Sequence, residues 1–183
     1  MGYFNYEIAK EQFKNNEFVL ETIKRLQDFN EFHCLRDSVP HSLKSVSTIL
    51  INVPDEYLQW LSICNGGMLF DTTLLSVDAH DPQIGLDFST LAEYNTSSNK
   101  QCCMLPDGYS IIALRSDGAP ICVIDNRRLP ISSHIYLFDC EKGSITDIWD
   151  TFYDFLAEEV DTALELIANK DLEPIPLKIL NNL

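Results

Sequence analysis

The sequence predicts an α+β fold, in which an antiparallel sheet of about four to six strands packs against N-terminal helices and a long C-terminal helix. Two observations predict this class. Apolar residues recur at helical spacing over residues 53–64 and 149–167, and short β-branched and apolar runs separated by turn residues fill most of the chain between them. One face of such a sheet is packed and the other can stay open.

The clearest helix signal lies in residues 53–70. Pro54 suits the first helical position, and the two acidic residues after it place negative charge at the positive end of the helix dipole. We expect Asn65-Gly66-Gly67 to end this helix, because these residues tolerate the left-handed conformation, and a strand to follow over Met68–Phe70. The apolar stripe of the helix contains Tyr57, Leu58, Trp60, Leu61 and Cys64.

The residues before this helix predict further helices. Residues 1–15 fit either an arm or a first helical turn, and helical spacing from Glu17 ends near Phe32. Asp37–Pro40 is typical of a turn. A short helix over Leu43–Leu50, capped by Ser42 or Ser45, is expected to pack beside the helix that begins at Pro54.

The residues after Phe70 predict mainly strands. We expect a helix or helical turn over Leu86–Tyr94 with Asp87 as its cap, a polar loop over Asn95–Gln101, and a final amphipathic helix from Trp149 to Ile167. Pro174 and Pro176 prevent the tail from being helical throughout. The expected strands are Thr72–Val77, Tyr109–Leu114, Ala119–Asp125, His134–Asp139 and Ser144–Ile148.

Several of these segments together resemble the SUKH superfamily, which contains fungal cell-wall-synthesis regulators and many bacterial relatives. The resemblance covers about residues 42–168 and includes a hairpin over 105–124 and an aromatic strand over 135–139. Ser116–Pro120 departs from the Gly-Asp that the family often has in this hairpin. The residues that match the family signature are Pro54, Tyr57, Trp60, Leu61, Asn65, Gly66, Gly67, Trp149, Phe152, Phe155 and Leu156.

Length and composition predict one globular domain. The 183 residues, 45% of them hydrophobic, are enough for a sizeable core. We expect a single domain over 1–183, with an arm or helix over 1–41, a core over about 42–168 and a short tail over 169–183. The chain has no apolar run long enough to cross a bilayer and no signal-peptide pattern, so we expect a cytoplasmic protein.

Six cysteines lie at positions 34, 64, 102, 103, 122 and 140, and none forms a Cys-x-x-Cys pair. We therefore expect six free thiols that are mostly buried. A redox role for the adjacent Cys102 and Cys103 stays open.

The sequence lacks the common catalytic motifs, so we expect no enzyme activity and no cofactor. Asp78, His80 and Asp81 form a cluster that fits either a metal or acid-base site or, as is usual for a loop histidine beside aspartates, a solvated loop. His33-Cys34 fits half of a nucleophilic pair only if a third group orients it. Trp60 and Trp149 are expected in the core.

The net charge of −15 is concentrated in two windows. Residues 53–107 hold 8 acidic and 1 basic side chains, and residues 141–183 hold 10 acidic and 3 basic ones. Such a field disfavours nucleic acid and anionic membranes as ligands and favours a basic protein partner, although acidity also serves solubility alone.

The SUKH resemblance implies a non-catalytic binding protein, most often a bacterial immunity protein that neutralises a cognate toxin, frequently a nuclease. The alternative is a regulatory scaffold like the fungal members. A first acidic set is the preferred partner-binding surface, and Asp147, Asp150, Asp154 and Glu158 on the final helix form a second acidic set. The first acidic set contains Asp71, Asp78, Asp81, Asp87 and Glu93.

Overall fold

The computed structural model describes residues 4–37, 53–77, 90–115, 120–125, 127, 132–171 and 174. Its helices are α1 (Tyr6–Gln12), α2 (Glu17–Asp28), the short 3₁₀ helix η1 (Asn30–Phe32), α4 (Asp55–Leu61), α5 (Leu91–Tyr94), α6 (Ser97–Cys102) and α7 (Phe152–Asn169). Its strands are β1 (Cys34–Asp37), β2 (Cys64–Leu69), β3 (Thr72–Leu74), β4 (Tyr109–Arg115), β5 (Pro120–Asp125), β6 (Ile135–Asp139) and β7 (Ser144–Trp149).

The described strands form one antiparallel sheet in which each strand pairs with the next along the chain, from β1 to β7. The α+β prediction is confirmed, and the sheet exceeds the expected four to six strands because β1 was not predicted. β1 has four residues at the edge of the sheet, and its strand conformation depends on pairing with β2, which local sequence does not reveal.

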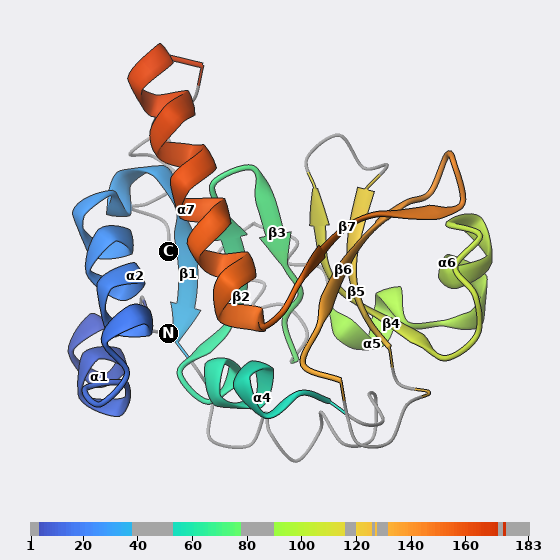
Figure 1. Ribbon diagram of the computed structural model, residues 1–183, viewed down its shortest axis with the longest axis horizontal. Helices are drawn as coiled ribbons and strands as arrows, with labels where there is room; N and C mark the ends of the chain where they lie inside the picture. The colour runs from blue at the N-terminus through green and yellow to red at the C-terminus, as the bar shows by residue number, and fades with distance from the viewer. Residues whose placement is uncertain are drawn as a thin grey trace, which may run out of the picture.

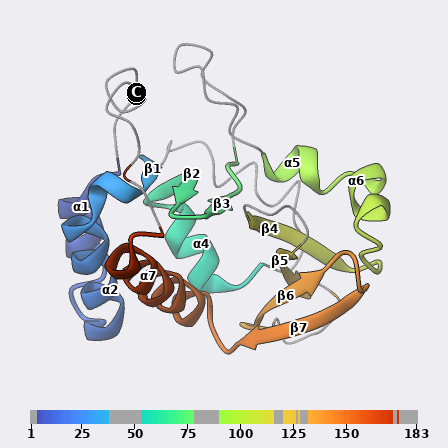
Figure 2. The same cartoon turned by 90° about the horizontal axis from the view of Figure 1, so that it is seen from above.

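The helices lie at three places around the sheet (Figures 1 and 2). α1, α2 and α7 gather beside β1–β3, α4 lies next to β2, and α5 and α6 lie on the side of β4 away from α1 and α2. β7 is the far edge strand, and the chain passes from it directly into α7. The long C-terminal helix therefore covers the sheet while its preceding strand stays at the rim.

The end of α4 differs from the prediction. The helix ends at Leu61, and Asn65, Gly66 and Gly67 lie inside β2 rather than at a helix C-terminus. Both glycines have positive φ, +74° and +127°, as expected. The reason is close approach of three strands: a Cβ at Gly67 would lie 2.2 Å from the Cys34 oxygen in β1, and one at Gly66 would lie 2.7 Å from the Leu74 oxygen in β3.

Aromatic side chains join α4 to α7 in the core. The Tyr57 and Phe152 rings lie 5.0 Å apart between centroids, and the Trp60 and Phe152 rings lie 6.0 Å apart. α7 begins at Phe152, with Thr151 as its N-cap, so Trp149 ends β7 instead of starting the helix. Trp149 still packs on α7, because its ring lies 5.2 Å from that of Phe155.

The other local predictions have mixed outcomes. Of the two alternatives for residues 1–15, the helical one holds: residues 6–12 form helix α1, capped by Asn5, whose side chain accepts from the Ile8 N–H. Residues 97–102 form helix α6 instead of a polar loop, because Thr96 caps it in the same way. α5 is capped by Thr90. The predicted helix over 43–50, the hairpin turn over 116–119, Asp87 and most of the tail lie outside the described residues.

We predict that Gly67→Val lowers the free energy of unfolding by about 3 kcal/mol or more, because the new side chain meets β1 backbone at a φ that L-residues avoid. Gly143→Asn is the matched control, because φ there is +64°, which asparagine tolerates, and a Cβ would meet only a methyl group at 3.7 Å. Urea unfolding of the three proteins measures both effects. Equal stability of Gly67→Val and the wild type would contradict the close approach of β1 and β2.

Candidate functional site

The first acidic set is only partly described. Asp71 lies in the turn between β2 and β3, and Glu93 lies in α5, whereas Asp78, Asp81 and Asp87 fall outside the described residues. Asp71 lies directly before the first residue of β3. Glu93 follows Thr90, and Thr90 forms an isolated β-bridge with Ser76, which lies just after the last residue of β3. The two described members thus lie at opposite ends of this extended segment. Whether the whole set forms one contact surface stays a prediction.

The second acidic set is not a helix stripe. Asp147 lies on β7 and Asp150 lies between β7 and α7, so only Asp154 and Glu158 belong to the helix. Both helical residues make structural contacts: Asp154 accepts a hydrogen bond from the Thr151 hydroxyl at 2.7 Å, and Glu158 accepts one from the Trp149 indole at 2.7 Å. Asp147 and Asp150 are exposed and make no such contact with the core.

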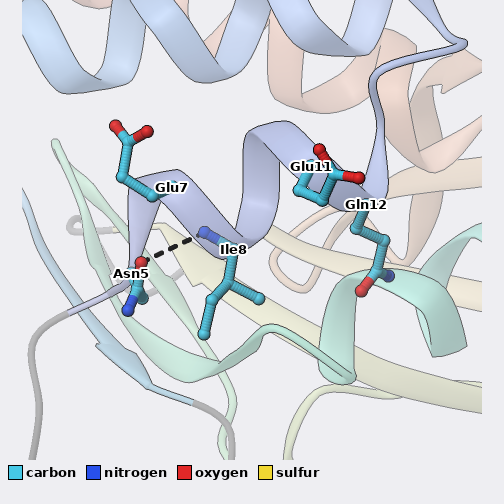
Figure 3. Close-up of a pocket in the computed structure, with 5 residues that line it drawn as sticks. All are labelled: Asn5, Glu7, Ile8, Glu11 and Gln12. Atoms are coloured by element: carbon cyan, nitrogen blue, oxygen red, sulfur yellow. Dashed lines mark hydrogen bonds between the residues drawn. The ribbon is translucent and has the colours of Figure 1, made fainter.

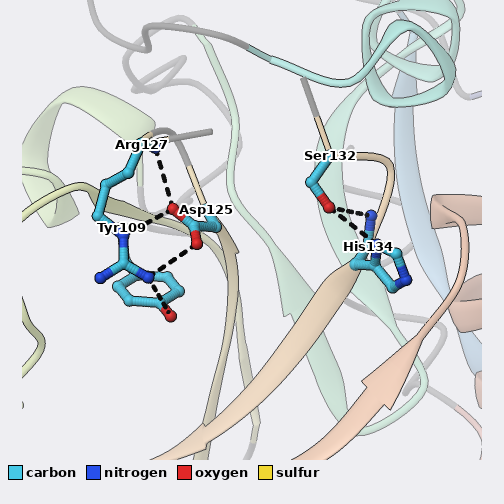
Figure 4. Close-up of polar contacts among 5 residues, drawn as sticks. All are labelled: Tyr109, Asp125, Arg127, Ser132 and His134. Atoms are coloured by element: carbon cyan, nitrogen blue, oxygen red, sulfur yellow. Dashed lines mark hydrogen bonds and ion pairs between the residues drawn. The ribbon is translucent and has the colours of Figure 1, made fainter. Parts of the chain in front are cut away.

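Ser132, His134 and Asp150 come together in an arrangement that resembles a catalytic triad, and Figure 4 shows the first two. The Ser132 hydroxyl lies 2.8 Å from His134 Nδ1, and His134 Nε2 lies 3.4 Å from an Asp150 carboxylate oxygen. However, the Ser132 oxygen also accepts the backbone N–H of His134, which is the pattern of a local turn. The Asp150 side chain is 89% exposed, so water screens it and it cannot hold the imidazole in one orientation. The geometry favours a turn over a nucleophile.

Figure 4 also shows a cluster in which Arg127 holds the end of β5 against β4. Its guanidinium group donates to both carboxylate oxygens of Asp125 at 2.8 Å and to the Tyr109 hydroxyl at 2.7 Å, and it lies 4.3 Å from the centre of the Tyr109 ring. A bidentate, stacked guanidinium of this kind is fully engaged with the protein. We interpret it as structural.

A buried carboxylate fastens α7 to the sheet. Glu159 is 3% exposed, accepts a 2.6 Å hydrogen bond from the Thr72 hydroxyl of β3, and forms an ion pair with Arg115 of β4. Burial raises its pKa, and the Thr72 hydrogen bond and the Arg115 charge act in the opposite direction. Each of its two oxygens has a partner, so this cluster also serves the fold.

A shallow hollow of about 540 Å³ lies beside α1 (Figure 3). Its carboxylates are neutralised by nearby lysines, since Glu7 pairs with Lys10 of the same helix at 2.7 Å and Glu11 pairs with Lys14 in the turn that follows. Gln12 donates to the Gln59 carbonyl and the Ser62 hydroxyl, which ties α1 to α4. The hollow has no converging polar groups of the kind that orient a small ligand.

His33 is a buried structural histidine. Its Nε2 lies 2.8 Å from the Leu26 carbonyl and 3.0 Å from the Tyr6 hydroxyl, so it connects α1, α2 and β1. Because a carbonyl only accepts, Nε2 carries the proton, and the buried Nδ1 has no partner among the described residues. Burial lowers the pKa of His33 and raises that of Cys34, which keeps the imidazole neutral and the thiol protonated. Neither residue is poised for nucleophilic chemistry.

The described residues contain no group of three or more His, Cys, Asp and Glu side chains placed to bind a metal ion. The Asp78, His80 and Asp81 cluster lies outside them. Among the described helices, none combines the length and apolarity needed to cross a membrane.

The sequence matches the SMI1 / KNR4 family (SUKH-1) over residues 47–158. The chain belongs to this SUKH-1 family. The match begins shortly before α4 and ends within α7, so it includes α4, strands β2–β7 and the first part of α7. A comparison with curated proteins found no match.

The residues that resemble the SUKH signature are core residues. Pro54, Asn65 and both signature glycines are buried, and the aromatic and leucine members are at most 5% exposed. Asn65 accepts a 2.8 Å hydrogen bond from the Val77 N–H, which fixes the chain beyond β3. The signature therefore specifies the fold and does not itself mark a binding surface.

We predict that His33 makes the fold sensitive to mild acid. A lowered folded pKa means that the unfolded chain binds the proton more readily, so stability is complete above about pH 6.5 and declines as pH falls below it. Urea unfolding from about pH 7.5 to about pH 5.5 should show this decline in the wild type and a smaller one in His33→Gln. Parallel pH profiles of the two proteins would contradict this assignment.

We predict that all six thiols react when the denatured protein is alkylated without reductant, because none of the six described cysteines is in a disulfide. Mass spectrometry should show six added groups. In the native protein the exposed Cys102 should react first. The informative result is loss of modification at both Cys103 and Cys140, because the neighbouring Cys103 helps to raise the pKa of Cys140 and the two are therefore close. A disulfide between them would contradict the prediction.

Proposed function

We propose that this SUKH-1 protein is a non-catalytic binding protein, an immunity protein that neutralises a cognate toxin by covering its active site. Family membership is the observation that carries the proposal. The charge supports it, because a protein of net charge −15 attracts a basic partner, and nuclease toxins present basic surfaces to their substrate.

The polar clusters of the described residues support binding rather than catalysis. Glu159, Arg127 and His33 are each engaged in contacts that hold elements together. Ser132 and His134 form a turn beside an exposed carboxylate, without the buried orienting group that nucleophilic catalysis uses. Acidic side chains on the surface, in contrast, are numerous and well placed to steer a partner.

The proposal predicts protection from a toxin domain encoded beside this gene. Cells that express the C-terminal domain of the neighbouring secreted protein should stop growing, and co-expression of this chain should restore growth. With the purified proteins, the association rate should fall about 10-fold or more as salt rises from about 50 mM to about 500 mM, because the attraction is electrostatic. An unrelated acidic protein of similar charge is the control.

Continued growth arrest despite stable co-expression, with no complex between the purified proteins, would overturn the immunity proposal and leave the regulatory scaffold as the alternative. If the complex forms with an association rate that does not depend on salt concentration, the binding function stands, and the acidic residues serve solubility alone.

A further inference from the structure

The outer corner of the sheet at β7 exposes a cluster of apolar side chains. Met104, Ile145 and Ile148 are 56%, 38% and 53% exposed, and they are three of the six large apolar side chains exposed among the described residues. Met104, which follows α6, lies beside the β6–β7 turn at one end of this edge, because its Cε lies 3.7 Å from the position a Cβ would take at Gly143. Exposed apolar side chains gathered in this way often mark an interaction site.

A β-bulge aligns the two isoleucines. Ile145 pairs with Phe138 and Ile148 pairs with Tyr136, and the register shifts between them. Phe138 and Tyr136 are two residues apart, so their side chains lie on one face of β6. Their partners Ile145 and Ile148 therefore lie on the same face of the sheet, although they are three residues apart, because the bulge adds one residue to β7. This face is opposite to the one on which Trp149 packs against Phe155 of α7. The isoleucines therefore form a stripe that α7 does not cover.

Negative charge flanks this stripe. Asp147 pairs with Leu137 and therefore lies on the other face of this edge strand, beside Ile148 along the chain, and Asp150 follows Ile148 by two residues; both aspartates are exposed. In the described part of the chain, neither aspartate forms an ion pair with a lysine or arginine, and the nearby Lys142 is already paired with Asp139 at 2.7 Å. We call Met104, Ile145, Asp147, Ile148 and Asp150 the β7 surface. It contrasts with the hollow beside α1, whose glutamates carry their own lysines.

The edge of β7 is poorly suited to pairing with another strand. The bulge interrupts its regular register, and the Ile148 N–H already donates to the Asp147 carboxylate at 2.8 Å. Both features hinder an edge strand from pairing with a strand of another molecule. A second copy of the chain would also bring another −15 charge against this acidic edge. The combination of an apolar centre and an acidic rim fits a basic protein that binds through side chains.

We propose that the β7 surface is the contact surface for the basic toxin domain, an inference that rests on the immunity function proposed above. Ile148 and Ile145 supply the apolar centre, where water is excluded, and Asp147 and Asp150 supply the rim that meets cationic side chains. This assignment places the contact on part of the second acidic set rather than on the first.

Two matched pairs of variants and one further variant test the assignment against the toxin domain encoded by the neighbouring gene. Ile148→Asp is compared with Ile8→Asp, because Ile8 is 58% exposed but lies on α1. The double variant Asp147→Lys/Asp150→Lys is compared with Asp71→Lys/Glu93→Lys from the first acidic set. Ile148→Ala separates loss of the apolar contact from introduction of charge. Thermal unfolding confirms that each variant is folded before binding is measured.

We expect Ile148→Asp to weaken binding about 30-fold or more and Ile8→Asp to change it less than about two-fold. The Asp147→Lys/Asp150→Lys variant should slow association about 10-fold at low salt, and the first-set variant should not. Equal affinity of Ile148→Asp and the wild type overturns the β7 assignment while the immunity function stands. A wild type that does not bind the domain at all overturns the immunity function itself.

Two further outcomes identify other occupants. If the Asp71→Lys/Glu93→Lys variant loses affinity for the toxin domain while the β7 variants retain it, the contact surface lies at Asp71 and Glu93, and the inference is overturned. A wild-type chain that is a dimer by light scattering, and becomes a monomer with Ile148→Asp, assigns the surface to a second copy and overturns it as well.

Discussion

The close approach of β1, β2 and β3 is the constraint on which the rest of this structure depends. β2 lies between two neighbours whose backbones leave no room for a Cβ at Gly66 or Gly67. This approach pairs β1 with β2 and brings β3 into position to pair with β4, from which the sheet continues to β7. Without it, the N-terminal helices that β1 anchors would lose their place beside the core.

The core uses this sheet to hold α4 and α7 together. Phe152 contacts both Tyr57 and Trp60, so one ring at the start of α7 fixes the helix against α4. Farther along α7, the buried Glu159 reaches β3 and β4 through Thr72 and Arg115. These two contacts, apolar at the start of α7 and ionic farther along it, fix the position of the helix. Because β7 leads directly into α7, its position at the edge of the sheet is fixed as well.

Buried polar groups and surface carboxylates have different tasks in this protein. Those inside, such as His33 and Asn65, each satisfy a specific backbone group. The exposed aspartates near β7, Asp147 and Asp150, make few contacts that hold the fold together and remain available to a partner. An isolated surface charge adds little stability, so acidic side chains that make no structural contact are best explained by their effect on solubility and association.

Local sequence predicted the elements whose signals are self-contained. The amphipathic patterns of α2, α4 and α7, and the apolar runs of β4 to β6, follow from periodicity alone, and the family resemblance arises from the same residues. Local reasoning failed where pairing decides the conformation. Cys34–Asp37 becomes a strand only because β2 lies beside it, and Asn65-Gly66-Gly67, which resembles a helix stop, is a strand because two neighbours require glycine there.

The candidate contact surface shows the same division. The sequence by itself determined the excess of negative charge and its concentration in two windows. Only the tertiary structure separated Asp147 and Asp150 from the helical Asp154 and Glu158, since the boundary at Thr151 depends on where β7 ends. It alone also placed Ile145 and Ile148 on one face and Met104 beside the turn before β7, because a bulge and an approach across some forty residues of chain leave no periodic signal in the sequence.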